Sequence, residues 1–401
     1  MIRLTIAAAL LASAAPVLAE NHTIAPGEGA QERLQEALIL AEPGDTIVLE
    51  AGRYALTDGL SLDVDGVTIK GAGMGADGSA SILDFTAQQG AGEGLLVTSD
   101  NVTLRDFAIE NAKGDGIKSK GADNIIYHAL RVEWTNGPDE KNGAYGIYPV
   151  EASNILVQDS YVRGASDAGI YVGQSENIIV RRNRVVENVA GIEIENSNKA
   201  EVTENLATRN TGGILVFDLP GLPKVGGGDV LVARNAVIDN NTDNFAPEGN
   251  IVASVPAGTG VMVMANTNVQ VKDNALINNS TSHVMLIAYS QDYDDERYQP
   301  RPVNVMLQGN VYGSGGANPD FEGGAMLLAA MGAEALPPVL SDGLHTNLKV
   351  EDAVPVLSLG LTKVGQPLTE AQPAMWSQPE GVSAEALAEV ALPADMELRL
   401  K

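Results

Sequence analysis

The sequence predicts an all-β fold: a single right-handed parallel β-helix with three short strands in each coil of about 22 residues. Two patterns and one physical argument lead to it. A polar residue followed by an apolar-x-apolar strand recurs along the middle of the chain, and a glycine before an apolar pair recurs in step with it. A strand this short cannot bury its apolar face alone. The coils must therefore stack, with each strand pairing in parallel with its equivalent.

The polar columns show the period of the repeat. Successive coils begin at Asn101, Asn124, Asn154, Asn177, Lys199, Asp229, Asn268 and Asn304. Asparagine returns six residues after the later members, at Asn183, Asn205, Asn235, Asn274 and Asn310, and eleven residues after four of them, at Asn188, Asn210, Asn240 and Asn279. Asparagine tolerates a left-handed bend and its amide both donates and accepts, so we predict hydrogen-bonded ladders between coils. An Asn-rich ligand surface is the alternative.

Two predicted segments precede the repeat. Residues 1–19 combine a positive start at Arg3, a short apolar run and small residues before Glu20, which is typical of a secretory signal cleaved before Glu20. A membrane-anchor helix is the alternative. Residues 20–43 form a capping segment, within which residues 29–41 show helical spacing. This amphipathic helix should cover the open strand edges of the first coil.

The predicted β-helix spans residues 44–321. Its opening strands are expected at residues 46–49, 60–62 and 67–69. Longer intervals in the repeat mark loops inserted between strands, at about residues 134–145, 218–228, 241–259 and 289–302. Beyond this region the repeat fades. We expect residues 322–401 to close or wrap the last coil and to begin with a short helix at 325–335.

Composition narrows the class of protein further. The chain has 401 residues and no cysteine, which excludes disulfides, thiolate metal sites and cysteine nucleophiles. Aromatic residues make up 4%, so the core must be aliphatic. The net charge of -27 argues against a nucleic-acid partner, because phosphate binding needs a basic face. After signal cleavage we expect no membrane span and a location in the periplasm or outside the cell.

Several runs resemble a known group of proteins. They lie at residues 44–49, 167–177, 190–196 and 213–221. These runs are similar to those of exported, single-chain parallel β-helix repeat proteins of bacteria, a broad group that also includes NosD-type accessory proteins and mannuronan C5-epimerases. The resemblance covers most of the mature chain and implies the β-helix fold. It implies no single activity, because β-helices carry lyases, hydrolases, epimerases, adhesins and inert scaffolds.

One motif allows the resemblance to the epimerases to be tested residue by residue. The family's run is Tyr-Gly-Phe-Asp-Pro-His followed by an acid, and its Asp, His and Tyr remove and return the proton beside a uronate carboxylate. Tyr145 and Glu151 match this run, but Tyr148 replaces the Asp and Val150 replaces the His. A further family carboxylate one coil later corresponds to Gly173 here. Because a base and its partner are both replaced, we do not expect proton abstraction by that machinery.

Stacked coils also align their outward side chains. One outward column is expected to contain Lys118, Tyr148, Tyr171, Glu193 and Leu215, and the column beside it Lys120, Val150, Gly173, Glu195 and Phe217. Neighbouring tyrosine rings offer an apolar face with a polar tip, which suits sugar rings. Packing of half-buried tyrosines under a loop is the alternative.

These columns lead to our main functional prediction, an exported non-catalytic binding or accessory protein whose partner is a glycan or another exported protein. The candidate binding residues are Lys118, Lys120, Tyr148, Tyr171, Glu193 and Glu195. The charge supports this region, because residues 113–199 carry ten Lys and Arg against twelve Asp and Glu, whereas the rest of the chain is strongly acidic. This near-neutral stretch includes Arg163, Arg181, Arg182 and Arg184. An anionic ligand would meet less repulsion here than elsewhere.

The second hypothesis is a polysaccharide-active enzyme, a lyase, epimerase or hydrolase, acting on polyuronate-type glycans. Its suspected catalytic residues are Tyr145, Glu193 and Glu195. The two glutamates alternate outward on one strand about 7 Å apart, a separation that suits an inverting glycosidase. Two solvated surface glutamates are the alternative explanation.

The third hypothesis is a periplasmic copper-handling accessory protein similar to NosD. Met262, Met264, His283 and Met285 lie on successive coils, and thioether and imidazole ligands suit copper. Packing of the methionines under a loop is the alternative. Four acids crowd one inserted loop, where they would either bind calcium or remain solvated: Asp292, Asp294, Asp295 and Glu296. Our prediction for the whole chain is that it needs no cofactor.

Overall fold

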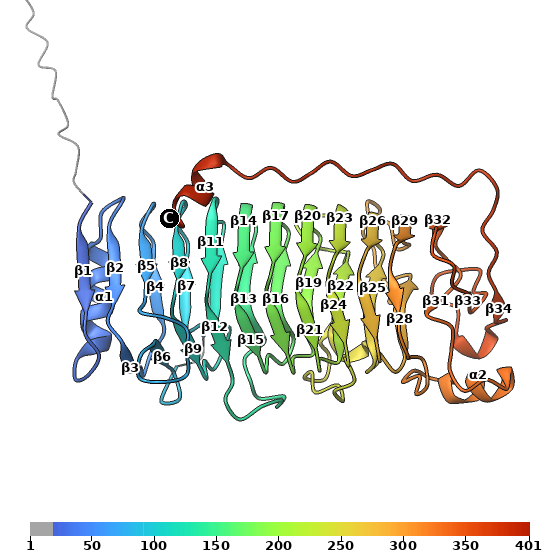
Figure 1. Cartoon of the computed structure of the whole chain (residues 1–401), viewed down its shortest axis with the longest axis horizontal. Coiled ribbons are helices and arrows are strands. Elements are labelled where there is room, and N and C mark those ends of the chain that lie inside the picture. The colour runs from blue at the N-terminus through green and yellow to red at the C-terminus, as the bar shows by residue number, and fades with distance from the viewer. Residues whose placement is uncertain (1–18, 91) are drawn as a thin grey trace, which may run out of the picture.

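The computed structural model describes residues 19–90 and 92–401. Apart from its last residue, the predicted signal at 1–19 lies outside the described residues. Three long sheets run side by side, and successive coils add a strand to each (Figure 1). The strands pair in parallel except for one antiparallel pair at the C-terminal end. Within the described part, no helix is long and apolar enough to cross a membrane.

The three sheets contain the following strands in spatial order. Sheet A consists of β1 (Asn21–Ile24), β2 (Thr46–Leu49), β5 (Thr68–Lys70), β8 (Thr103–Arg105), β11 (Ile125–His128), β14 (Ser153–Gln158), β17 (Glu176–Arg181), β20 (Asn198–Thr203), β23 (Gly228–Ala233), β26 (Thr267–Lys272), β29 (Val303–Gln308) and β32 (Thr346–Val350). Sheet B consists of β3 (Gly52–Ala55), β6 (Ser81–Asp84), β9 (Ala108–Glu110), β12 (Arg131–Glu133), β15 (Tyr161–Arg163), β18 (Arg184–Val186), β21 (Leu206–Thr208), β24 (Ala236–Ile238), β27 (Ala275–Ile277) and β30 (Val311–Tyr312). Sheet C consists of β4 (Leu60–Leu62), β7 (Leu95–Val97), β10 (Ile117–Lys120), β13 (Tyr145–Val150), β16 (Ala168–Gly173), β19 (Ala190–Glu195), β22 (Gly212–Phe217), β25 (Thr259–Met264), β28 (Ser282–Ile287), β31 (Val339–Ser341), β33 (Val356–Ser358) and β34 (Ala374–Met375).

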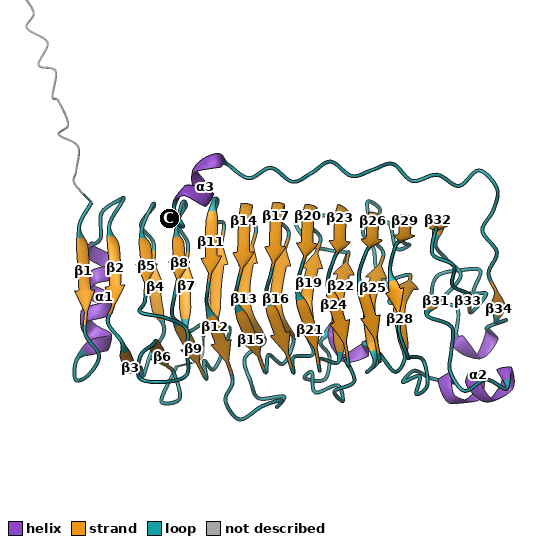
Figure 2. Cartoon of the chain, in the orientation of Figure 1, coloured by secondary structure: helices purple, strands orange, loops and turns teal. Residues whose placement is uncertain are grey.

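Helices lie at the two ends of the β-helix, in one inserted loop and on the outside of sheet A, where α3 packs (Figure 2). They are α1 (Ala30–Leu40), η1 (Ile251–Ser254), α2 (Gly324–Met331), η2 (Leu368–Glu370) and α3 (Ala394–Leu398). The four predicted inserted loops are confirmed, since each predicted range falls between consecutive strands. The predicted short helix at 325–335 corresponds to α2.

The first coil is covered by α1, as predicted. Leu34 and Leu38 of this helix are fully buried against the opening strands. The capping segment, residues 20–43, also contains β1, which the residue pattern did not predict. This strand pairs with β2 in parallel and places one more strand at the end of sheet A. The β-helix therefore begins earlier than the predicted boundary at residue 44.

The interior is mostly aliphatic, as predicted, although five aromatic side chains are also buried in the core of the coils before β13. Ile117, Ile147, Ile170, Ile192 and Ile214 pair in register on successive strands of sheet C, and all are fully buried. Burying one such side chain contributes about 1.5–3 kcal/mol. Repetition of the column from coil to coil thus supplies the core that no single short strand can form.

The asparagine ladders are also confirmed. The side-chain amide of Asn183 donates to Oδ1 of Asn205 and to the backbone oxygen of Val157, both at 3.0 Å. The amide of Asn188 donates to Oδ1 of Asn210 at 3.0 Å in the second column. These asparagines are at most 2% exposed. Their amides are therefore used inside the fold, and the alternative of an Asn-rich ligand surface is wrong for these two columns.

The β-helix continues beyond its predicted end at residue 321. Strands β31, β32 and β33 extend sheets C and A after the insertion that contains α2. This insertion breaks the period of the sequence, which is why the residue pattern did not assign the last strands to the β-helix.

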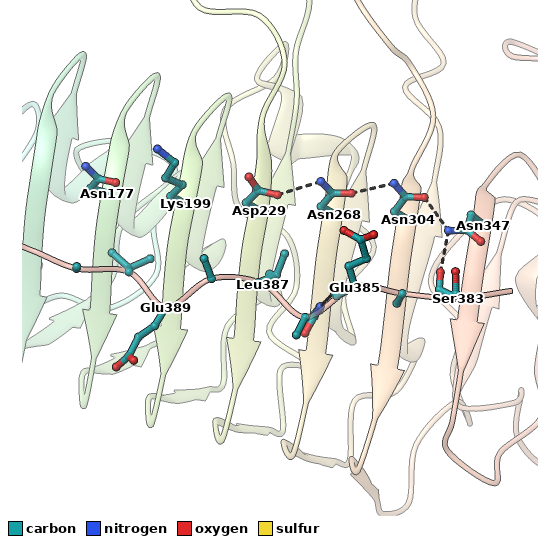
Figure 3. A pocket seen from close by; sticks show the side chains of 16 residues that line it. Asn177, Lys199, Asp229, Asn268, Asn304, Asn347, Ser383, Glu385, Leu387 and Glu389 are labelled. Carbon is teal, nitrogen blue, oxygen red and sulfur yellow. Dashed lines mark hydrogen bonds between the residues drawn. The ribbon is translucent and has the colours of Figure 1, made fainter.

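The segment between β34 and α3, residues 376–393, then runs back along the outside of sheet A (Figure 1), and we call it the strap. Figure 3 shows this strap crossing the strands of sheet A alongside the row of coil-starting residues, where the backbone oxygen of Ser383 accepts a hydrogen bond from Asn347 at 3.1 Å. A cavity of about 610 Å³ lies between the strap and that row. The strap ends in α3, whose Met396 is fully buried against Ile126, Leu156 and Ile179. The tail thus wraps the coils, as expected.

Candidate active site

The outer face of sheet C carries the two predicted columns in the predicted register. Tyr171 pairs with Glu193, and Gly173 pairs with Glu195 on the next coil. Because side chains alternate along a strand, Ile194 points into the core while both glutamates point outward. The strand register thus places the candidate residues of successive coils side by side.

Three tyrosines pack together on this face. The rings of Tyr145 and Tyr148 on β13 have centroids 4.4 Å apart, and the ring of Tyr171 on β16 lies 4.7 and 4.8 Å from them. Tyr148 and Tyr171 were predicted neighbours, whereas Tyr145 was not assigned to their column. Gly146 faces the interior, where a Cβ would meet Val162 at 2.2 Å, and Tyr145 before it joins the outer face.

Three carboxyl groups are buried beside the tyrosines, and we call Asp167, Glu193 and Glu195 the acid cluster. Their exposed fractions are 5%, 1% and 7%. The hydroxyl of Tyr171 donates to Oε1 of Glu195 at 2.8 Å, and the hydroxyl of Tyr145 donates to Oδ2 of Asp167 at 3.3 Å. The explanation of Glu193 and Glu195 as solvated surface residues is therefore wrong.

Two features of the acid cluster differ from the sequence prediction. Asp167 was not among the predicted site residues, although it stands directly before Ala168, which pairs with Tyr145. Glu193 and Glu195 are both buried, and the charge of Glu195 raises the pKa of Glu193, whereas the residue pattern predicted two outward side chains.

Burial raises the pKa of every acid in the cluster. It raises the pKa of Asp167 to about 7, and the charge of Glu195 adds to this effect. The pKa of Glu193 is raised well above its usual range by burial and then by the charges of its two neighbours. Burial raises the pKa of Glu195 as well, but the hydrogen bond from the Tyr171 hydroxyl opposes the rise. Burial thus favours the protonated form of Glu193 more strongly than that of Glu195.

The same region contains carboxyl oxygens that have no hydrogen-bond partner among the described residues. They are Oδ1 of Asp167, Oε2 of Glu193 and Oδ1 of Asp218. Burial raises the pKa of Asp218 to about 7. Most buried polar atoms in native proteins are paired, so three such oxygens in one region mark a functional site more readily than a structural one.

A loop closes over the acid cluster, and we call residues 239–258, between β24 and β25, the cover loop. Val252 and Val255 of this loop are buried in the apolar cluster that also contains Tyr171. The side-chain amide of Asn250 donates to Oδ2 of Asp167 at 3.2 Å. A sugar can reach the acid cluster only when the cover loop moves.

The two candidate lysines differ in their relation to the site. The ammonium group of Lys118 lies 4.8 Å from the ring centroid of Tyr148, and 3.2 and 3.6 Å from carboxyl oxygens of Glu93 and Asp115. Burial raises the pKa of Asp115 to about 6. The ammonium group of Lys120 instead lies 3.3 Å from a carboxyl oxygen of Glu151, and the Lys120 side chain is more than half exposed. Only Lys118 belongs to the tyrosine cluster.

The copper candidates do not converge. Met262 and Met285 pair in register on the outer face of sheet C, and both are buried with Met264 in an apolar cluster. The ring of His283 lies within hydrogen-bond distance of the Asn279 amide and of the Gly313 backbone oxygen, both at 3.2 Å. Both ring nitrogens are thus used within the fold, which leaves the methionines without an imidazole partner.

Acidic groups do not form a metal centre either. In residues 19–90 and 92–401, no group of three or more His, Asp or Glu side chains is arranged to hold a metal ion. In the acidic loop considered for calcium, both carboxyl oxygens of Asp295 accept hydrogen bonds from Arg297.

The fold and the outer face of sheet C together define the class: the chain is a right-handed parallel β-helix protein. Residues 65–222 match the family model described as a right-handed β-helix region. No curated protein matches the chain. The match to the β-helix family model and the observed fold both agree with the resemblance and the fold class predicted from the sequence.

Solved structures share the fold at low sequence identity. The A-module of mannuronan C-5 epimerase AlgE4 from Azotobacter vinelandii is 16% identical, with a TM-score of 0.50 over 82% of this chain and 95% of that chain. The family 28 exopolygalacturonase of Yersinia enterocolitica is 12% identical, with a TM-score of 0.50 over 82% of this chain and 72% of that chain. At these identities the similarity concerns the fold alone.

Proposed function

We propose that this protein is a carbohydrate-active enzyme that cleaves a glycan by acid–base chemistry at the acid cluster. The observation that carries the proposal is the burial of Glu193 and Glu195 side by side on one strand, beside hydrogen-bonded tyrosines on the outer face of a β-helix. The proposal takes up the enzyme hypothesis in place of the main prediction of a non-catalytic binding protein. It is consistent with the named activities of the two structures that share the fold, both of which are carbohydrate enzymes.

Hydrolysis of a glycosidic bond needs one carboxyl that donates a proton and one that accepts a proton. The donor gives its proton to the bridging oxygen as the bond to the anomeric carbon breaks. The acceptor takes a proton from the water that forms the new bond to that carbon. We assign the donor role to Glu193, whose pKa is raised well above its usual range, and the acceptor role to Glu195, which accepts a hydrogen bond from the Tyr171 hydroxyl.

Asp167 supplies a third group that exchanges its proton near neutral pH, because burial raises its pKa to about 7. Its hydrogen bonds from Tyr145 and from Asn250 connect the acid cluster to the tyrosines and to the cover loop. Binding of a glycan along the tyrosines would replace the contact with Asn250. Opening of the cover loop and a change in the protonation of Asp167 are therefore coupled.

The test is turnover by the purified mature protein on a panel of neutral polysaccharides and polyuronates. New reducing ends, unsaturated uronates and the epimer composition would be measured together. We expect product from at least one polymer, and its loss in Glu193→Gln and in Glu195→Gln. Glu140→Gln, in the exposed loop before β13, is the matched control and should keep full activity.

Glycan binding without catalysis is the second candidate function. It is favoured by the half-buried ring of Tyr148, which Lys118 approaches from the side away from the acid cluster. Binding of a polymer without any product, weakened by Tyr148→Ala, would support this candidate and contradict the enzyme. Neither binding nor product on the whole panel would contradict both.

A further inference from the structure

A second hollow lies on sheet B, on another side of the β-helix from the acid cluster. It has a volume of about 840 Å³, and its floor is formed by β12, β15, β18 and β21. The loop between β5 and β6 forms one wall through Met74 and Gly75. Nothing in the proposed catalytic site contributes to this hollow.

Most charged groups in the hollow are already paired. The guanidinium of Arg131 contacts carboxyl oxygens of Glu110 and Glu133, both at 2.7 Å, and donates to the backbone oxygens of the wall loop. The guanidinium of Arg182 donates twice to Asp159 at 2.8 Å. These groups serve the structure and have little capacity left for a ligand.

Arg184 differs from the other charged groups. It is exposed on β18, and no acid within the described chain forms an ion pair with it. Its guanidinium carbon lies 5.8 Å from the ring centroid of Tyr161, the residue that pairs with it on the preceding coil. The ring of Tyr161 is half-buried, and no described residue hydrogen-bonds to its hydroxyl. The hollow thus presents one cation without an acid partner among the described residues, lying over one half-buried aromatic ring.

We propose that this hollow is an additional glycan-binding site that recognises a carboxylated sugar. The guanidinium of Arg184 would form a bidentate pair with the sugar carboxylate, while the ring of Tyr161 would hold that guanidinium in position and contact the sugar ring beside it. A planar guanidinium has the geometry that this pairing requires. The site would hold a glycan without acting on it, and it does not depend on the proposed catalysis.

The charges further restrict the ligand to sparsely charged glycans. Only one cation is free, and three acids line the same hollow: Glu133, Asp159 and Glu204. The protein also carries a net charge of -27. A polymer with a carboxylate on every residue would therefore gain one ion pair and meet repulsion along the rest of its length. A neutral glycan with an isolated uronate branch fits better.

The experiment is calorimetric titration of the purified mature protein at physiological ionic strength with three oligosaccharides. They are xylotriose bearing one 4-O-methylglucuronate, unsubstituted xylotetraose and a tetramer of galacturonate. We expect the singly charged oligosaccharide to bind most tightly. Arg184→Gln should weaken its binding about ten-fold, as expected for loss of a charge-assisted contact. Tyr161→Ala should weaken it as well, whereas Tyr161→Phe should not.

Two controls separate this site from the acid cluster and from general charge effects. Arg209→Gln removes an exposed arginine of the neighbouring coil that is paired with Glu187, and it should leave the affinity unchanged. Tyr148→Ala, on sheet C, should also leave it unchanged, so a failure here is distinct from a failure of the proposed enzyme. Equal affinity of Arg184→Gln and the unaltered protein would overturn the proposal. Tightest binding of the galacturonate tetramer would overturn the preference for an isolated carboxylate.

Discussion

The outer faces of sheets B and C both contain buried carboxyl groups, but only those of sheet B lie beside arginines. Both place carboxyl groups outward on neighbouring strands. On sheet B the carboxyl of Glu110, 4% exposed, contacts Arg53 and Arg131 at 2.7 Å. On sheet C the carboxyls of Glu193 and Glu195 are 1% and 7% exposed, no cation of the described residues forms an ion pair with them, and Glu195 accepts a hydrogen bond from the Tyr171 hydroxyl. A buried carboxyl beside a cation forms a structural ion pair, whereas a buried carboxyl without a cation favours its protonated form.

This difference indicates which carboxyl groups of a repeating fold can take part in proton transfer. A carboxylate held by arginine is ionised at every physiological pH and its oxygens are occupied. A carboxyl without a cation has a raised pKa and keeps an oxygen free, as Glu193 does. The first arrangement stabilises the fold, and the second is suited to proton transfer.

The largest expected effect separates the two faces by function. Glu193→Gln should lower the turnover of a cleaved glycan about 10³-fold, because a general acid contributes 10²–10⁴-fold. Arg184→Gln should leave the turnover of a short neutral substrate unchanged. Initial rates with saturating substrate would check both. Equal losses in the two variants would contradict the separation of the sites.

The second prediction concerns stability. Arg131→Met should lower the free energy of unfolding by about 3 kcal/mol, because it leaves Glu110 buried with one cation fewer. Urea unfolding followed by circular dichroism would measure it. Arg209→Met is the matched control: this arginine is half exposed, and its pair is worth less than about 1 kcal/mol.

The third prediction is a pH dependence that comes from sheet C. The pKa of Asp167 is raised from 3.8 to about 7 in the folded chain. A carboxyl with a raised folded pKa stabilises the fold below its unfolded pKa, and this stability is lost as the pH rises through about 7. The free energy of unfolding should thus be about 2 kcal/mol larger at pH 5 than at pH 8. Asp167→Asn should reduce this difference, and an unchanged difference would contradict the origin in the acid cluster.

The smallest expected effect concerns the cover loop. Asn250→Ala removes one hydrogen bond to Asp167 and should cost about 1 kcal/mol of local closing free energy. Hydrogen exchange of the amides in residues 239–258 should accelerate several-fold. The amides of β18 and β21, under the second hollow, should exchange at an unchanged rate. Acceleration on both faces would point to general loosening of the coils instead.

Much of the site was predictable because strand register follows from the repeat. The position of Tyr171 beside Glu193 needs only the alternation of side chains and the parallel stacking of coils. The burial of Glu193 was not predictable from the same pattern. An outward residue of a β-helix is exposed by default, and local sequence does not show that a loop inserted about fifty residues later returns to cover it.

Asp167 illustrates the same limit at a single residue. It stands in the bend before β16, outside the alternating pattern, so no rule assigned its side chain a direction. The contacts with Tyr145 and Asn250 come from coils before and after its own. Its role depends on three segments meeting, which is a property of the folded chain.

The sequence by itself determined the all-β class, the stacking of short parallel strands, the asparagine ladders, the aliphatic core and the helix that covers the first coil. These features follow from periods and turn residues that act within one coil or between equivalent positions of adjacent coils. Only the tertiary structure decided which outward acids are paired, which are buried without a cation, and where the inserted loops and the C-terminal strap lie. The physical reason is that burial and pKa depend on contacts between distant segments, whereas strand pairing in this fold repeats a local pattern.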